Sequence, residues 1–294
     1  MSSAALPTVG ARFRLRDGRW LGYAEYGDPA GRPIFSFHGN PGSRLTRNPN
    51  IALLARLGAR LIAVERPGYG LSDFKVGRAV LDWPDDVAEL ADGLGIARFA
   101  VVGGSGGGPY TLACAHQLPQ RLTAVVVISS PCPLTVPGVT TGMSRQNRFS
   151  FLLGRYLPWP LLRRLYDMQA GLLAQQPEAL LDRLAGTLAP SDRAVLARPE
   201  VRAVLREGVA EAFRQGGRGL AWDTHLLARP WGFRLQNIAA PVHLWHGARD
   251  VLAPVGMGRY LARSLPHCDA TFLSDEGHLL VYAHWEEILA QLIA

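Results

Sequence analysis

Residues 99–110 constrain this chain more than any other stretch, because an apolar run there meets a serine between glycines. The run is β-branched, as in a buried strand, and residues 110–117 have the apolar content of a packed helix. Between them, Gly103, Ser105 and Gly107 fit the pattern Gly-x-Ser-x-Gly. On so tight a strand-to-helix turn the serine backbone is strained, and small flanking residues let strand and helix approach. The stretch predicts a hydroxyl at a helix N-terminus, where backbone N–H groups favour negative charge.

Strand and helix patterns alternate through the first 131 residues. Strands are expected at residues 12–16, 21–26, 33–37, 60–64, 99–102 and 123–129, and helices at 50–57, 82–93 and 110–117. Asp17-Gly18 is a hairpin signal between the first two strands. Continuous apolar strands that alternate with helices are typical of an α/β fold, with a mostly parallel sheet flanked by helices. Ligands bind at the carboxyl ends of such strands.

The pattern changes between residues 132 and 234, where strand signals are nearly absent. Helices are expected there at 149–157, 160–174, 177–189 and 199–215, and the α/β pattern resumes at 241–245, 270–273 and 285–293. We therefore expect a core domain formed by 1–131 and 235–294, with 132–234 inserted as a helical cap over the sheet edge. The alternative is that these helices simply cover the flank of the sheet.

Charge and cysteine content narrow the class of protein. The net charge of +7 comes from 31 basic and 24 acidic residues, and the arginines are spread singly rather than clustered. No basic tract or nucleic-acid motif is present, so no nucleic-acid partner is expected. Cys114, Cys132 and Cys268 are too few and too scattered for a disulfide framework. With no signal-peptide pattern and no membrane-length apolar stretch, we expect a soluble cytoplasmic protein without a membrane partner. Nothing indicates its oligomeric state.

A serine hydroxyl is a poor nucleophile unless a neighbouring base takes its proton, and a histidine oriented by a carboxylate does this near neutral pH. Both residue types follow later strands. Asp250 comes after the strand at 241–245, and His278 comes after the strand at 270–273. Each is placed at the same sheet edge as Ser105. Asp275 and Glu276 are rival acids, but they lie too close in sequence to His278 to reach its far nitrogen.

In this order of serine, aspartate and histidine, the chain resembles the α/β-hydrolase fold family over essentially its whole length. The resemblance implies Ser105 as nucleophile, Asp250 as orienting acid and His278 as general base. The loop His38-Gly-Asn-Pro-Gly matches the oxyanion loop of the family. The backbone N–H groups of Asn40 and Gly106 would then bind the oxyanion. The loop at 66–72 matches a further family signature, usually structural. No metal or organic cofactor is implied.

We therefore expect a serine hydrolase, carboxylesterase-like, that cleaves an uncharged or anionic small-molecule ester through an acyl-enzyme. Haloalkane dehalogenases and epoxide hydrolases of this fold use an aspartate nucleophile, which Ser105 disfavours. Carbon–carbon bond hydrolysis, aminopeptidase or amidase activity and acyl transfer use the same three residues and stay open. A non-catalytic ligand-binding homologue is a further alternative. The aromatic side chains expected to line the substrate pocket are Trp159, Trp222, Trp231 and Phe233.

Overall fold

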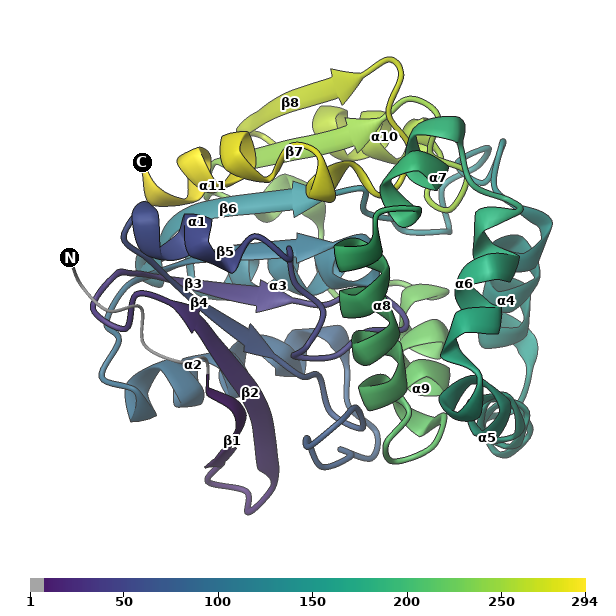
Figure 1. Cartoon of the computed structure of the whole chain (residues 1–294), viewed down its shortest axis with the longest axis horizontal. Coiled ribbons are helices and arrows are strands. Elements are labelled where there is room, and N and C mark those ends of the chain that lie inside the picture. The colour runs from purple at the N-terminus through teal and green to yellow at the C-terminus, as the bar shows by residue number, and fades with distance from the viewer. Residues whose placement is uncertain (1–7) are drawn as a thin grey trace.

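The computed structural model describes residues 8–294, and the strands within them form one eight-stranded sheet (Figure 1). Its order is β1-β2-β4-β3-β5-β6-β7-β8. The strands are β1 (Thr8–Arg14), β2 (Trp20–Gly27), β3 (Arg32–Phe37), β4 (Ala59–Val64), β5 (Phe99–Gly104), β6 (Leu122–Ile128), β7 (Val242–Gly247) and β8 (Cys268–Leu273). The pairs from β4 to β8 are parallel, whereas β1 pairs with β2 and β2 with β4 in antiparallel fashion. The expected α/β fold with a mostly parallel sheet is confirmed.

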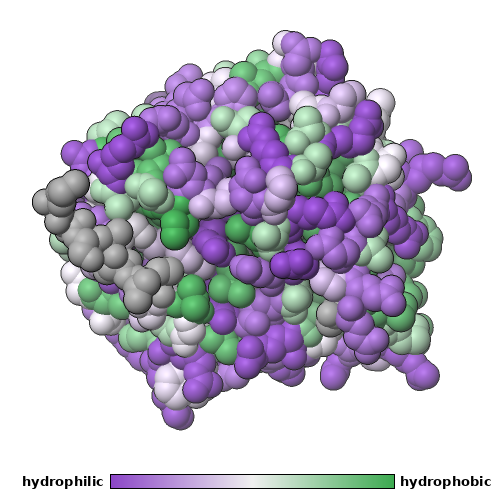
Figure 2. Space-filling view, viewed as in Figure 1, coloured by the Kyte–Doolittle hydropathy of each residue, from purple (hydrophilic) through white to green (hydrophobic). Residues whose placement is uncertain are grey.

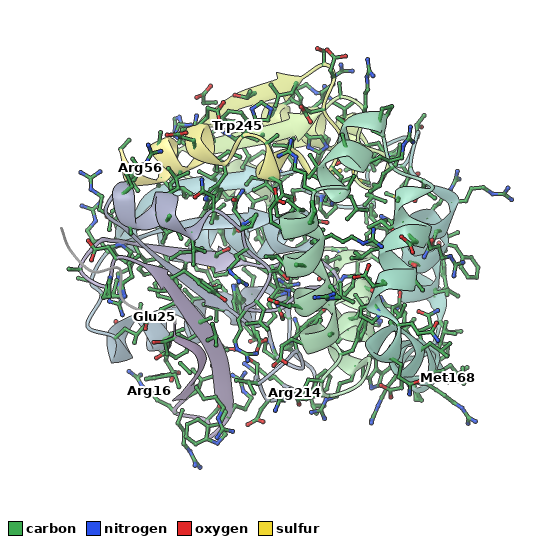
Figure 3. The ribbon with its side chains drawn as sticks, viewed as in Figure 1. Arg16, Glu25, Arg56, Met168, Arg214 and Trp245 are labelled. Atoms are coloured by element: carbon green, nitrogen blue, oxygen red, sulfur yellow. The ribbon has the colours of Figure 1, made fainter. Side chains whose placement is uncertain are left out.

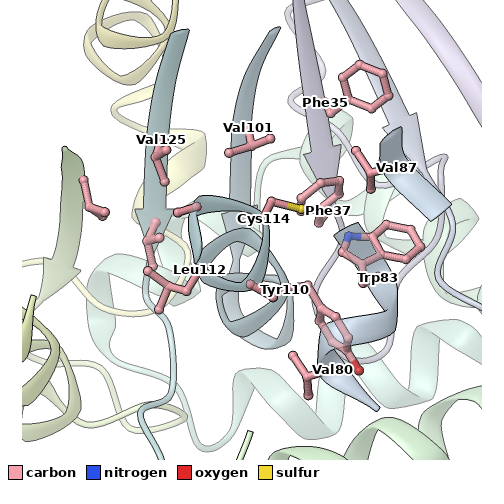
Figure 4. Packing of buried hydrophobic residues seen from close by; sticks show 14 of the residues in the cluster. Phe35, Phe37, Val80, Trp83, Val87, Val101, Tyr110, Leu112, Cys114 and Val125 are labelled. Atoms are coloured by element: carbon pink, nitrogen blue, oxygen red, sulfur yellow. The ribbon is translucent and has the colours of Figure 1, made fainter. Parts of the chain in front are cut away.

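Helices cover both faces of this sheet. One face carries α1 (Ile51–Arg56) and α11 (Trp285–Ile293), and the other carries α2 (Trp83–Gly93), α3 (Gly108–Gln117) and α10 (Val255–Ser264). Figure 4 shows Leu112 and Cys114 of α3 packed between that helix and the strands. Both side chains are fully buried. Burial of each large aliphatic side chain contributes about 1.5–3 kcal/mol.

Six helices of the described chain lie between β6 and β7 and stand over the carboxyl ends of the strands (Figure 1, teal to light green). They are α4 (Arg145–Tyr156), α5 (Trp159–Gln175), α6 (Pro177–Ala185), α7 (Pro190–Leu196), α8 (Pro199–Ala212) and α9 (Arg218–Leu227). We call residues 145–227 the insertion. The single helix expected at 177–189 is wrong, because the chain turns at Gly186 and restarts as α7 with Pro190 in its first turn. The helix expected at 199–215 ends at Ala212, and α9 was not expected.

The outer surface is mixed in polarity. On the face seen in Figure 2, hydrophobic residues form small groups among hydrophilic ones. Between residues 8 and 294, no helix has the length and apolar character needed to cross a lipid bilayer.

Candidate active site

Ser105 lies on the sharp turn that the glycine pattern predicted. Strand β5 ends at Gly104, and Ser105 has a φ of 52°, in the left-handed region that L-residues rarely adopt. A Cβ atom added to Gly103 would lie 2.6 Å from the carbonyl oxygen of Gly107, and one added to Gly107 would collide with that of Phe37. Both positions therefore require glycine, and the expected strained turn with small flanking residues is confirmed.

Asp250 and His278 are brought together by the ends of β7 and β8. His278 Nδ1 lies 2.7 Å from Asp250 Oδ2, and the other oxygen of Asp250 accepts the backbone N–H groups of Leu252 and Ala253 at 2.8 and 2.9 Å. These bonds fix the carboxylate so that Oδ2 faces the ring. The rival acid Asp275 is 78% exposed and instead pairs with Arg249, which lies in the loop after β7.

The electrostatic surroundings of His278 favour its charged form. Burial opposes that form, but the charge of Asp250 and its hydrogen bond outweigh burial, and the Asp192 carboxylate adds to them. The pKa of His278 is consequently raised above its ordinary value of 6.5. An imidazole in this setting is a stronger base than one in water.

Ser105 and His278 both line one cavity of about 300 Å³ beneath the insertion. Among the described residues, no hydrogen bond joins the Ser105 hydroxyl to the His278 ring. The cavity brings the two side chains to a common space that a small substrate could occupy. Its apolar wall consists largely of Leu180, Leu181, Leu184, Leu205, Val209, Leu252, Tyr282 and Trp285.

The aromatic lining expected from the sequence is wrong. The Trp159 ring stacks on that of Phe74, in the segment after β4, with 6.0 Å between the ring centroids, and the Trp222 ring packs 4.5 Å from that of Trp159. Trp231 is buried in the main core, where Phe233 packs beside it. None of these four rings lines the Ser105 cavity.

A second, more open hollow of about 540 Å³ lies along α5 and shares no lining residue with the Ser105 cavity. Met168, which lines it, lies at the outer edge of the molecule in Figure 3. We therefore place the candidate active site at the Ser105 cavity.

Asn40 and Gly106, the two expected oxyanion donors, lie against each other. A Cβ atom added to Gly106 would lie 2.6 Å from Asn40 Cγ, so the Asn40 amide covers the residue after the serine. A Cβ atom added to Gly39 would lie 3.3 Å from Ser105 Cβ. The loop after β3 therefore borders the Ser105 turn.

Two buried carboxylates of the insertion were missed by sequence reasoning. Asp192, on α7, accepts the backbone N–H groups of His278 and Leu279. A Cβ atom on Gly277 would lie 2.7 Å from an oxygen of Asp192, so this approach requires the glycine. Asp223, on α9, pairs with the guanidinium groups of Arg66 and Arg78, and Arg66 also contacts the loop after β3. Both acids look like ordinary helical surface residues in sequence, and no local pattern marks them.

Comparison with known proteins agrees with this fold. A sequence model of the alpha/beta hydrolase fold family matches residues 32–284. A Caulobacter vibrioides protein that carries the name of a carbamate hydrolase is 30% identical over 213 residues, which cover 69% of this chain and 70% of that protein. The pimeloyl-[acyl-carrier protein] methyl ester esterase of Aromatoleum aromaticum is 28% identical over 240 residues, which cover 78% of this chain and 84% of that protein.

Solved structures extend the likeness to the whole fold. The enol-lactonase of Burkholderia xenovorans superposes with a TM-score of 0.70 at 19% identity, covering 96% of this chain and 99% of that one. The sheet order, the strained serine turn and the family match over residues 32–284 all indicate the same fold family. The chain belongs to the α/β-hydrolase fold family, a class of hydrolytic enzymes.

Proposed function

We propose that this protein is a serine hydrolase that cleaves a small-molecule ester through an acyl-enzyme. The observation that carries the proposal is the 2.7 Å pair of His278 and Asp250 beside the cavity that Ser105 also lines. In this scheme His278 takes the proton of Ser105 as the hydroxyl oxygen attacks the ester carbonyl carbon. The proton then passes to the departing alkoxide.

The second half of the reaction uses the same groups. Water loses a proton to His278 and attacks the acyl carbon, and Ser105 leaves as it regains the proton. The N–H groups of Asn40 and Gly106 stabilise the oxyanion in both halves, and each such donor is worth roughly 2.7–4 kcal/mol in the transition state. Asp250 holds the imidazole in the productive tautomer and stabilises its charged form.

The cavity lining supports a small, largely apolar ester that is neutral or anionic. A volume of about 300 Å³ accommodates a substrate of modest size. Within the described residues the lining includes Arg47 but no aspartate or glutamate. The Arg47 guanidinium lies 4.9 Å from the Tyr26 ring centroid and 3.8 Å from the Glu207 carboxylate, so a substrate carboxylate would share this guanidinium with Glu207.

We propose that residues 132–234 act as the cap of this site, because leucines of α6 and α8 form one wall of the cavity. The boundaries at 131/132 and 234/235 stay predictions, as does the cytoplasmic location. Carbon–carbon bond hydrolysis, amide cleavage and acyl transfer remain alternatives that use the same residues.

The experiment that tests the proposed function is hydrolysis of short p-nitrophenyl esters by the wild type and by Ser105→Ala. We expect the wild type to hydrolyse these esters and the variant to have a kcat lower by roughly 10³-fold or more. Equal rates would remove Ser105 from the mechanism. A panel that adds amides, β-diketones and acyl acceptors ranks the alternatives.

A further inference from the structure

The peptide group between Gly39 and Asn40 is held from its carbonyl side. Gly39 O lies 2.8 Å from His38 Nδ1 and 3.3 Å from Arg66 Nη2. A trans peptide directs its N–H opposite to its C=O, so donors on the Gly39 oxygen point the Asn40 N–H away from themselves. That N–H is one of the two donors assigned to the oxyanion, and its direction depends on these two side chains.

His38 is neutral, and its tautomer follows from its partners. Burial and the nearby charge of Arg66 hold the pKa of His38 well below 6.5. The backbone N–H of Arg66 donates to His38 Nε2 at 3.2 Å, so the ring proton is on Nδ1. The ring therefore donates to Gly39 O, as the orientation of the peptide requires.

Arg66 holds the same loop through two further contacts. Its side chain is fully buried just after β4. It donates to the carbonyl oxygen of His38 and to Oδ1 of Asn40, each at 2.5 Å, in addition to Gly39 O. A planar guanidinium can serve these acceptors at once, and a positive charge at a peptide oxygen makes the N–H of that peptide a stronger donor.

The insertion supplies the counter-charge that allows Arg66 to be buried. Asp223 of α9 has no exposed surface, and its carboxylate lies 2.8 Å from Arg66 Nε. It also pairs with Arg78 and accepts the Tyr69 and Tyr110 hydroxyls at 3.0 and 2.7 Å. Burial opposes its charge, but the two guanidinium groups outweigh burial and hold the pKa of Asp223 well below its ordinary range.

We propose that Arg66 is a positioning residue of the oxyanion site, which orients and polarises the Gly39–Asn40 peptide, and that Asp223 of the insertion holds Arg66 in place. The inference rests on the proposed function, because it assigns Arg66 a role in stabilising the oxyanion formed at Ser105. It also makes the insertion part of the catalytic apparatus, since the charge balance beneath the oxyanion loop depends on a residue of α9.

The test compares Arg66→Lys with Arg78→Lys. Both arginines are buried beside Asp223 and both variants keep the charge, but Arg78 donates to Tyr110 and Asp223 rather than to the loop after β3. The readouts are kcat and KM for a p-nitrophenyl ester and the inhibition constant of a trifluoromethyl ketone, which forms a tetrahedral oxyanion with serine. Thermal unfolding of each variant shows whether it folds.

We expect Arg66→Lys to lower kcat by roughly 10²-fold and to raise the inhibition constant of the ketone by a similar factor, with KM changed by less than about 3-fold. We expect Arg78→Lys to change kcat and ketone affinity by less than about 3-fold, even where its melting temperature falls. Equal behaviour of the two variants, whether both lose activity or both retain it, overturns the inference.

If Arg66→Lys does not fold, Asp223→Asn takes its place, with Tyr110→Phe as its control. Asp223→Asn should lower kcat and ketone affinity in parallel, and a folded variant with unchanged ketone affinity contradicts the inference. Failure of the proposed function looks different. In that case the wild type itself hydrolyses no ester and no fluorophosphonate label reaches Ser105, whereas failure of the inference leaves both intact.

Discussion

Asp192 accepts a hydrogen bond of 2.8 Å from the backbone N–H of His278, although 86 residues separate the two in sequence. Its second oxygen accepts the next backbone N–H, that of Leu279, at 2.7 Å. A helix of the insertion thus holds the loop that carries the proposed general base. The loop position therefore depends on α7 as well as on β8.

Replacement of Asp192 by asparagine should weaken this loop and the base that it carries. The Asp192 carboxylate accepts two backbone N–H groups, one on each oxygen. An asparagine amide has only one oxygen, so its N–H₂ group would face one of these two donors. A buried donor left without an acceptor costs about 1–3 kcal/mol. The lost charge also lowers the pKa of His278. We expect a lower melting temperature and a kcat/KM reduced by roughly 10-fold, measured by thermal unfolding and ester hydrolysis. Asp182→Asn, at a side chain 70% exposed on α6, is the control and should change neither.

The pH dependence of ester hydrolysis should report His278. The ring must be neutral to take the proton of Ser105, so kcat/KM rises as His278 deprotonates. Because its pKa is raised above 6.5, the midpoint of the acidic limb should lie above that value in a profile of kcat/KM against pH. A midpoint below 6.5 would argue against the pair with Asp250 in the active enzyme.

Asp250→Asn should lower kcat by roughly 10⁴-fold, because it removes the carboxylate that sets the tautomer and stabilises the charged ring. The acidic midpoint should move to lower pH as well. Asp275→Asn is the matched control, since Asp275 is the rival acid and pairs with Arg249 at 2.6 Å outside the site. If Asp275→Asn were the damaging variant in steady-state kinetics, the assignment of the acid would be wrong.

Arg47 should determine how well the enzyme accepts an anionic ester. We expect Arg47→Gln to lower kcat/KM by roughly 10-fold for a p-nitrophenyl monoester that ends in a carboxylate, because a charge-assisted hydrogen bond is lost. A neutral p-nitrophenyl ester of equal length should change little. Arg206→Gln, at a half-exposed side chain of α8, is the control. An equal loss on both esters would mean that Arg47 acts on stability alone.

Gly107→Ala should damage the serine turn, because the added methyl group meets the carbonyl oxygen of Phe37. We expect a loss of about 1–3 kcal/mol in the free energy of unfolding, as for other overpacked sites, and a kcat lowered by at least roughly 10-fold. Gly171→Ala on α5 is the control, since its Cβ would have no neighbour within 4 Å. Denaturant unfolding should show that this control is as stable as the wild type or more stable.

The sequence allowed the sheet and the principal site residues to be placed because their signals are local. Apolar β-branched runs marked β5 and β6, and glycine spacing marked the turn at Ser105. Chain order then placed Asp250 and His278 at neighbouring strand ends. The structure pairs those two at 2.7 Å, and their catalytic roles stay a prediction.

The insertion could not be predicted in the same way, because its contacts join residues far apart in sequence. Asp192 and Asp223 have the local context of exposed helical acids, yet both are fully buried by loops of the core. The part of the cavity wall that the insertion contributes is aliphatic rather than aromatic, since α6 and α8 present leucines and a valine to it. Hydrophobic periodicity identifies a packed face but not the surface that it packs against.

The most direct measurement of the central claim is covalent labelling of the wild type by a fluorophosphonate, followed by peptide mass spectrometry. An activated serine beside a general base reacts with this probe, whereas an ordinary serine does not. We expect one modified residue, Ser105, with labelling abolished in Ser105→Ala and strongly slowed in His278→Ala. Labelling at another residue, or none in a protein that hydrolyses esters, would contradict it.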